Sequence, residues 1–221
     1  VSLCEQQSWR LVGDGEQGIV SARSSGLTVA CTGTGVRRGR GGAMRWFWID
    51  RFTEFERGQR ATAVKVVSLG EDALEDHLPG FPVFPWPLVV EGMAQAGGLL
   101  VGEMSGFRER VVLAKVGKAA FHCPAIPGDT ITYRVQLDDI RPDGALVSGT
   151  THLGDRLQGE FELMFAHLDH RVQGELFEPA EFLRMLRMMH MYTVGRKEDG
   201  SPLDVPPHML AAERALLSGA N

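Results

Sequence analysis

The sequence predicts an α+β domain in which one long buried helix is wrapped by a curved antiparallel sheet. Three observations predict this fold class. A strand hairpin comes first, one apolar run of helical length follows it, and four strand-like runs come after the helix. Strands on both sides of a single apolar helix can bury it most simply by curving around it.

The composition suits a single globular domain with extensions. The chain has 221 residues, of which 43% are hydrophobic, so it can bury a substantial core. Its formal net charge of -5 does not favour nucleic acid as a partner. No apolar run reaches the roughly 18 residues of a membrane helix. The three cysteines form no CxxC or CxxH pattern, so we expect reduced thiols in the cytoplasm and no metal site.

Residues 1–43 differ from the rest of the chain. They are rich in Gly, Ser, Thr and Arg, and they sustain neither strand nor helix periodicity. We expect an N-terminal extension that is either disordered or non-native. If it is non-native, the true start is Met44. A targeting peptide, which is also rich in Arg and Ser, is the alternative, and Glu5, Asp14 and Glu16 weaken it.

Strands are expected where apolar and polar residues alternate between turn signals. Residues 46–55 and 60–68 form the predicted hairpin, and residues 70–76 are a connection with room for one helical turn. The four later strands are expected at residues 110–121, 130–140, 145–152 and 156–168. Glycine-containing turns between them, such as Pro127-Gly128-Asp129, support these boundaries.

Prolines at positions 79, 82, 85 and 87 separate the hairpin from the helix. Each proline fixes φ and lacks an N–H, so neither a helix nor a central strand continues through them. Pro87 suits a first helical position, and the apolar run 88–104 continues the helix from there. We therefore divide the chain into residues 1–43, a central domain of residues 44–170, and a C-terminal helical extension of residues 171–221. Helices are expected at 178–191 and 207–217 in that extension.

Two titratable residues flank the proline segment. Glu91 lies in the apolar helix about one turn from its start, where burial would raise the pKa of the carboxyl and the helix N-terminus would lower it. His77 precedes the prolines, and imidazole titrates near neutral pH. Together they offer an acid and a base for proton transfer. A paired carboxylate and a structural histidine are the alternatives. The two can meet only if the proline segment folds back or a second subunit supplies one of them.

Two motifs carry a resemblance to a known family. The first is His77-Leu78-Pro79-Gly80-x-Pro82-x-x-Pro85 followed by Glu91-x-x-Ala94-Gln95. The second is Ala120-Phe121-His122-Cys123-Pro124-x-x-Pro127-Gly128-Asp129. Both resemble the β-hydroxyacyl-acyl-carrier-protein dehydratase family of the FabZ type, which has the hotdog fold. The resemblance covers residues 44–168 and leaves both extensions outside it.

The resemblance implies dehydration of (3R)-3-hydroxyacyl-acyl-carrier-protein thioesters to trans-2-enoyl thioesters, without a metal or an organic cofactor. It implies that His77 removes the α-proton and that Glu91 protonates the departing hydroxyl group. Backbone N–H groups near Trp86 and Leu88 would bind the thioester carbonyl, and the remaining substrate-binding positions would be Gly80, Phe84 and Gln95. It also implies a homodimer, with a trimer of dimers as the larger assembly, because the family pairs the histidine of one subunit with the glutamate of the other.

Trp86 is the main departure from the family pattern. The family usually has glycine there, and leucine at position 78 and glycine at position 92 are milder departures. The indole either packs away from the site, which preserves activity, or obstructs the acyl tunnel. Two rival functions stay open. One is acyl thioester hydrolysis, which other hotdog proteins perform, and the other is a non-catalytic acyl-binding homologue in which Trp86 blocks the tunnel.

Overall fold

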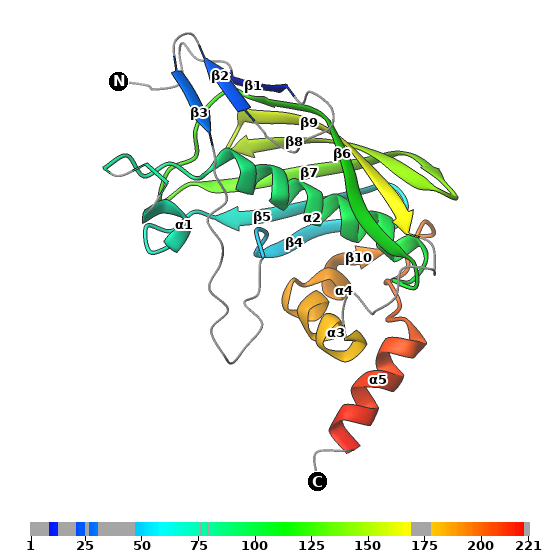
Figure 1. Ribbon diagram of the computed structural model, residues 1–221. Coiled ribbons are helices and arrows are strands. Elements are labelled where there is room, and N and C mark those ends of the chain that lie inside the picture. Colours follow the sequence, from blue (N-terminus) through cyan, green and yellow to red (C-terminus); the bar gives the residue numbers. More distant parts are fainter. Residues whose placement is uncertain are drawn as a thin grey trace.

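The computed structural model describes the backbone of residues 9–12, 21–24 and 27–30, together with residues 47–75, 77–78, 80–168 and 178–218. Within these ranges the expected fold class is confirmed. The long helix α2 (Trp86–Met104) lies across a curved sheet, which is the hotdog arrangement (Figure 1). No helix among the described residues is long and apolar enough to span a membrane.

Six antiparallel strands form the sheet that wraps α2. They are β4 (Arg51–Glu56), β5 (Arg60–Val66), β6 (Arg110–Phe121), β7 (Thr130–Arg141), β8 (Gly144–Leu153) and β9 (Arg156–Leu168). Their order across the sheet is β4-β5-β7-β8-β9-β6. The strand that follows the helix therefore lies at the opposite side of this sheet from the hairpin that precedes it. Helix α2 carries the chain between the two sides.

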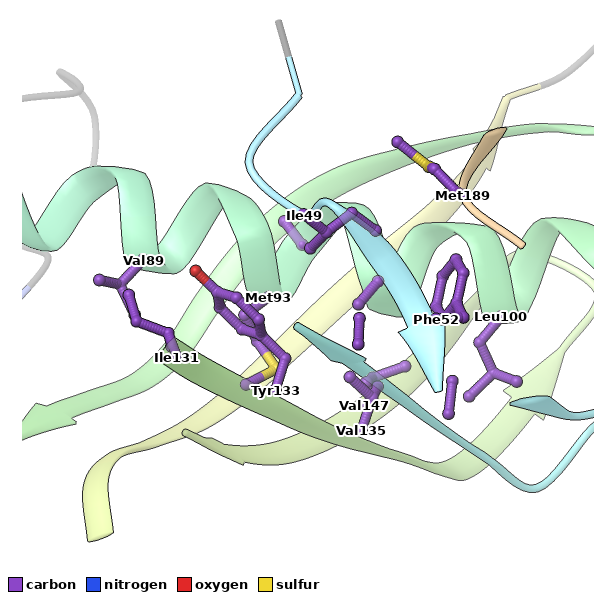
Figure 2. Close-up of a cluster of buried hydrophobic side chains, with 14 of the residues drawn as sticks. Ile49, Phe52, Val89, Met93, Leu100, Ile131, Tyr133, Val135, Val147 and Met189 are labelled. Carbon is purple, nitrogen blue, oxygen red and sulfur yellow. The ribbon is translucent and has the colours of Figure 1, made fainter. Parts of the chain in front are cut away.

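The core lies between the sheet and the buried face of α2. Strand β7 shows why, because its residues alternate between buried and more exposed positions, and Ile131, Tyr133 and Val135 point inward. They meet Val89 and Met93 of the helix, as Figure 2 shows. Burying each large apolar side chain of this kind stabilises the fold by about 1.5–3 kcal/mol.

Helix α2 begins at Trp86, one residue before the expected start, and Pro85 is its N-cap. The Pro85 carbonyl accepts hydrogen bonds from the N–H groups of Leu88 at 3.0 Å and Val89 at 3.2 Å. Pro87 lies in the first turn, where a missing N–H breaks no intrahelical hydrogen bond. The proline segment thus sets where the helix begins, as the sequence predicts.

The predicted strand over residues 46–55 is wrong at its start. Trp46 lies outside the described residues, and strand β4 begins only at Arg51. The Trp48 N–H donates to the side-chain oxygen of Gln95 at 2.8 Å instead of to a neighbouring strand. This hydrogen bond ties Trp48 to α2, and the segment joins the sheet only from Asp50, whose N–H donates to the Val64 carbonyl at 2.7 Å. The helical turn expected within residues 70–76 is confirmed as α1 (Asp72–Glu75).

The C-terminal extension packs against the central domain. It contains α3 (Pro179–Met188), α4 (Met191–Val194), β10 (Gly195–Arg196) and α5 (Pro207–Ser218). Strand β10, which the sequence does not predict, pairs in parallel with β4 and extends the sheet. The helix expected at 178–191 ends at Met188, because His190 adopts a left-handed conformation with φ of 60°. The Phe52 N–H also donates to the Met189 carbonyl at 2.8 Å, which fastens the extension to β4.

Three short strands continue the sheet beyond β6. They are β1 (Trp9–Val12), β2 (Ser21–Ser24) and β3 (Leu27–Ala30). Strand β1 pairs with the end of β6, Trp9 opposite Phe121 and Arg10 opposite Ala120. The expectation that residues 1–43 are disordered or non-native falls mainly on residues outside those described, so it stays a prediction. The same holds for the junction of the central domain and the C-terminal extension near residue 170.

Candidate active site

A cavity of about 670 Å³ runs along one face of α2. The helix residues that line it are spaced three or four apart, which places them in one stripe. They are Glu91, Ala94, Gln95, Gly98, Leu99 and Gly102. The other walls come from the loop and the start of β6 after the helix, from Phe165 on β9, and from the C-terminal extension. Glu91 is the lining residue closest to the start of the helix.

Gln95 holds the Glu91 carboxyl in place. Its side-chain nitrogen Nε2 donates to Oε1 of Glu91 at 3.0 Å, while its oxygen accepts from the Trp48 N–H at 2.8 Å. A backbone N–H can only donate, so it fixes the amide oxygen of Gln95 toward Trp48 and the amide nitrogen toward Glu91. The half-buried Glu91 is therefore held at the cavity wall by a residue one helical turn away.

His77 lies in a tight turn that follows α1. The Leu78 carbonyl accepts the Phe81 N–H at 2.9 Å, and Gly80 has φ of 78°, the positive value that the third residue of a type II turn requires. Burial lowers the pKa of the half-buried imidazole below its ordinary value of 6.5. The neutral form, which can accept a proton, is therefore favoured near pH 7.

One chain does not bring His77 and Glu91 into the same cavity. Of the predicted site residues, Glu91 and Gln95 line the cavity, whereas the described lining residues do not include His77, Gly80, Phe84, Trp86 or Leu88. Phe84 is buried, packs edge-on against Trp48 with ring centroids 5.8 Å apart, and donates its N–H to the Ala125 carbonyl at 2.8 Å. Phe84 thus joins the two sequence motifs, and Gly80 is exposed in the turn.

The Trp86 indole packs into the core rather than into the cavity. It stacks on Phe121 with ring centroids 4.5 Å apart and an interplanar angle of 30°. Phe121 in turn meets Phe161 edge-on at 5.5 Å. The backbone N–H of Trp86 has no hydrogen-bond partner among the described residues, so it can donate to a ligand. The Leu88 N–H, expected as a second donor, already donates to Pro85 within the helix start, which argues against that role.

The sequence did not reveal the far wall of the cavity. Phe107 follows α2, and Phe182, Met185, Met189 and Met209 come from the C-terminal extension. The sequence predicts helices at 178–191 and 207–217 but not which part of the central domain they contact. Only the folded chain brings them opposite the Glu91 stripe of α2.

Comparisons with known proteins agree with the motifs. The FabA-like domain family matches residues 44–153. The chain is 39% identical over 122 residues to the 3-hydroxyacyl-[acyl-carrier-protein] dehydratase FabZ of Symbiobacterium thermophilum, covering 55% of this chain and 86% of that relative. It is also 39% identical over 114 residues to the FabZ of Koribacter versatilis, covering 51% of this chain and 73% of the relative.

Solved structures that resemble this one are more distant. The dehydratase heterocomplex ApeI:P from Xenorhabdus doucetiae has a TM-score of 0.49 at 14% identity, over 57% of this chain and 86% of that one. A hypothetical thioesterase from Streptococcus pneumoniae with coenzyme A has a TM-score of 0.47 at 10% identity, over 57% of this chain and 91% of that one. The C-terminal extension lies outside the FabA-like match.

Proposed function

Because this chain belongs to the FabZ-type 3-hydroxyacyl-[acyl-carrier-protein] dehydratase family, we propose that it dehydrates (3R)-3-hydroxyacyl thioesters to trans-2-enoyl thioesters in fatty-acid biosynthesis. The observation that carries the proposal is the placement of Glu91. Its carboxyl faces an apolar-walled cavity and is fixed there by Gln95, within the segment that matches the family. Acyl carrier protein would deliver the substrate, and the reaction would take place in the cytoplasm.

In the proposed mechanism, the neutral imidazole of His77 removes the α-proton of the thioester. The electron pair of that C–H bond forms the new double bond as the C–O bond at carbon 3 breaks. Glu91 gives its proton to the departing hydroxyl group, which leaves as water. Proton transfer from His77 back to Glu91 restores both groups without a net change. The backbone N–H of Trp86, at the helix N-terminus, would stabilise the negative charge that develops on the thioester oxygen.

We propose that β6 completes the site by pairing with a second copy of the chain. Over residues 111–119 this strand pairs with β9 on one side, and on its other side it pairs with no strand among the described residues. Leu113 and Val116 on it are each 37% exposed. A long unpaired edge with exposed apolar side chains favours the addition of another strand. In such a homodimer, His77 of one subunit would approach Glu91 of the other; three such dimers would form the larger assembly.

The direct test follows the enoyl product and free thiol in parallel. We expect the protein to convert 3-hydroxyacyl thioesters to enoyl thioesters, also in the presence of a metal chelator. His77→Ala and Glu91→Gln should each reduce turnover by about 10²–10⁴-fold. Thiol release from a plain acyl thioester would instead support a thioesterase, and acyl binding without turnover would support the non-catalytic alternative.

Mixing the two variants tests whether subunits share the site. Refolding equal amounts of His77→Ala and Glu91→Gln chains makes half of the dimers mixed, each with one intact site. If the site lies between subunits, roughly a quarter of the wild-type activity should return. No recovery in demonstrably mixed dimers would contradict a shared site.

A further inference from the structure

The cavity beside Glu91 is closed by a part of the chain outside the FabA-like match. Phe182, Met185 and Met189 are 9%, 8% and 4% exposed, and all three line the cavity from the C-terminal extension. Phenyl and thioether groups offer no hydrogen bonds, so this wall suits a hydrocarbon. The opposite wall, by contrast, carries the carboxyl of Glu91.

The α2 face between these walls combines small residues with the larger Gln95 and Leu99. Ala94, Gly98 and Gly102 lie along it, and a Cβ atom at position 98 would contact only the Phe165 ring, at 3.4 Å. The stripe from Glu91 to Gly102 extends about 16 Å at the helical rise of about 1.5 Å per residue. The cavity volume of about 670 Å³ lies within the range of about 300–1,000 Å³ that is usual for ligand pockets.

Phe107 closes the Gly102 end of this channel. It is a non-glycine residue with φ of 59°, a conformation that bulky residues rarely adopt. The Phe107 ring packs against Gly102: a Cβ atom at position 102 would lie 3.1 Å from Cδ1 of Phe107, so a larger residue there would have to displace the ring. The Phe182 ring meets it edge-on, with centroids 5.2 Å apart. The extension thus helps to hold a strained aromatic residue at the end of the cavity.

Charged residues border the cavity next to this aromatic pair. Arg108, Glu109, Arg110 and His208 all line it, and Glu109 lies 3.2 Å from Nδ1 of His167. A hydrocarbon that passed Phe107 would have to displace water from these groups, which is unfavourable. The aromatic pair therefore marks the natural end of an apolar ligand.

We infer that the C-terminal extension forms the length-determining wall of the acyl site, with the thioester end of the substrate at Glu91 and its methyl end against Phe107, Phe182 and Met185. The substrate class is a straight acyl chain long enough to reach from the start of α2 to Gly102. This inference rests on the proposed dehydratase function, and it assigns part of the selectivity to Phe182 and Met185, which lie outside the family match.

The test measures binding rather than turnover. Saturated acyl-pantetheines from butanoyl to hexadecanoyl, which carry no 3-hydroxyl group to eliminate, are titrated calorimetrically into the intact protein. Affinity should rise by about fourfold for each methylene that is buried, until the chain reaches the wall, and rise no further beyond it. Wild-type protein that binds none of these probes, or binds all of them equally, would overturn the inference.

Substitutions of residues that line the cavity then test whether this wall sets the acyl-chain length. Met185→Ala should strengthen binding of the longest probe by roughly tenfold, because the enlarged cavity buries further methylenes. Gly98→Leu should weaken binding, with a loss that grows with chain length, and Gly98→Ala gives a smaller version of this effect if the leucine variant does not fold. Met188→Ala is the matched control, since Met188 lies on the same helix, is 53% exposed and is not among the cavity-lining residues.

The two proposals fail separately. If Met185→Ala folds and keeps the wild-type length profile while the protein dehydrates 3-hydroxyacyl thioesters, the extension is not the wall and the proposed function stands. If the length profile shifts as expected but no thioester is dehydrated, the cavity binds acyl chains and the proposed function fails.

Discussion

Tyr133 on β7 occupies the space that a side chain at position 92 of α2 would need. A Cβ atom there would lie 2.6 Å from the Tyr133 hydroxyl oxygen and 2.8 Å from the Trp48 carbonyl oxygen. Figure 2 shows the Tyr133 ring directed toward the helix, where burial raises the pKa of its hydroxyl above the usual range. The glycine next to Glu91 is thus matched to a tyrosine on the sheet.

Gly92→Ala should therefore destabilise the protein by about 1–3 kcal/mol, the usual effect of overpacking a core. It should do so although alanine favours a helix over glycine by about 1 kcal/mol. Urea unfolding at equal protein concentration measures the difference. Gly98→Ala is the control on the same helix: its Cβ has room, so we expect a stabilisation of up to about 1 kcal/mol. Equal free energies of unfolding for the two variants would contradict this account.

Gln95 should act as a positioning residue for Glu91. Gln95→Met keeps the length of the side chain but removes both the hydrogen bond to Glu91 and that from the Trp48 N–H. We expect kcat to fall by about 10–100-fold with little change in KM, because a misplaced catalytic group slows the reaction more than it weakens binding. Gln95→Glu, which also loses the amide donor, should not restore kcat. Kinetics of folded variants decide the matter, and an unchanged kcat for Gln95→Met would refute the role.

The dependence of kcat/KM on pH should reflect the protonation of the His77 imidazole. Burial lowers the pKa of this imidazole below 6.5, so the neutral, proton-accepting form persists to lower pH than in an ordinary histidine. On the acidic side of the profile, activity should therefore be lost only as the pH falls through this lowered pKa. The acidic limb of kcat/KM against pH measures this value. A limb centred above 6.5 would show that burial does not dominate in the assembled enzyme.

The Arg57 side chain should stabilise the packing of the β4–β5 hairpin against α2. It pairs with the buried Glu103 at 2.9 Å and donates to the Met104 carbonyl at 3.1 Å. The Arg57 side chain is 39% exposed, so solvent screens the pair, and we expect Arg57→Ala to destabilise the protein by only about 1–3 kcal/mol at pH 8.

This deficit should shrink as the pH falls. Burial raises the pKa of Glu103 and Arg57 opposes that rise, so without Arg57 the folded state binds a proton at Glu103 more readily than the unfolded state does. Unfolding titrations at pH 8 and pH 5.5 measure the change. A deficit that stays constant, or that grows at pH 5.5, would exclude Glu103 as its cause.

Local chemistry made much of the central domain predictable. Residues 110–121 and 156–168 were predicted as strands with the bounds of β6 and β9, because alternation and turn residues act over a few positions. The prolines set the start of α2 to within one residue. The start of β4 was predicted too early, since the Trp48 N–H bonds to a side chain 47 positions away.

The sequence alone determined the order of the elements from β4 to β9, the family, and the candidate pair His77 and Glu91, because motifs and periodicity are local properties. Only the tertiary structure decided that Gln95 fixes Glu91, that Trp86 stacks on Phe121, and that the C-terminal extension walls the cavity. Each of these depends on contacts between distant segments, and such contacts follow from how the whole core packs rather than from any single stretch of residues.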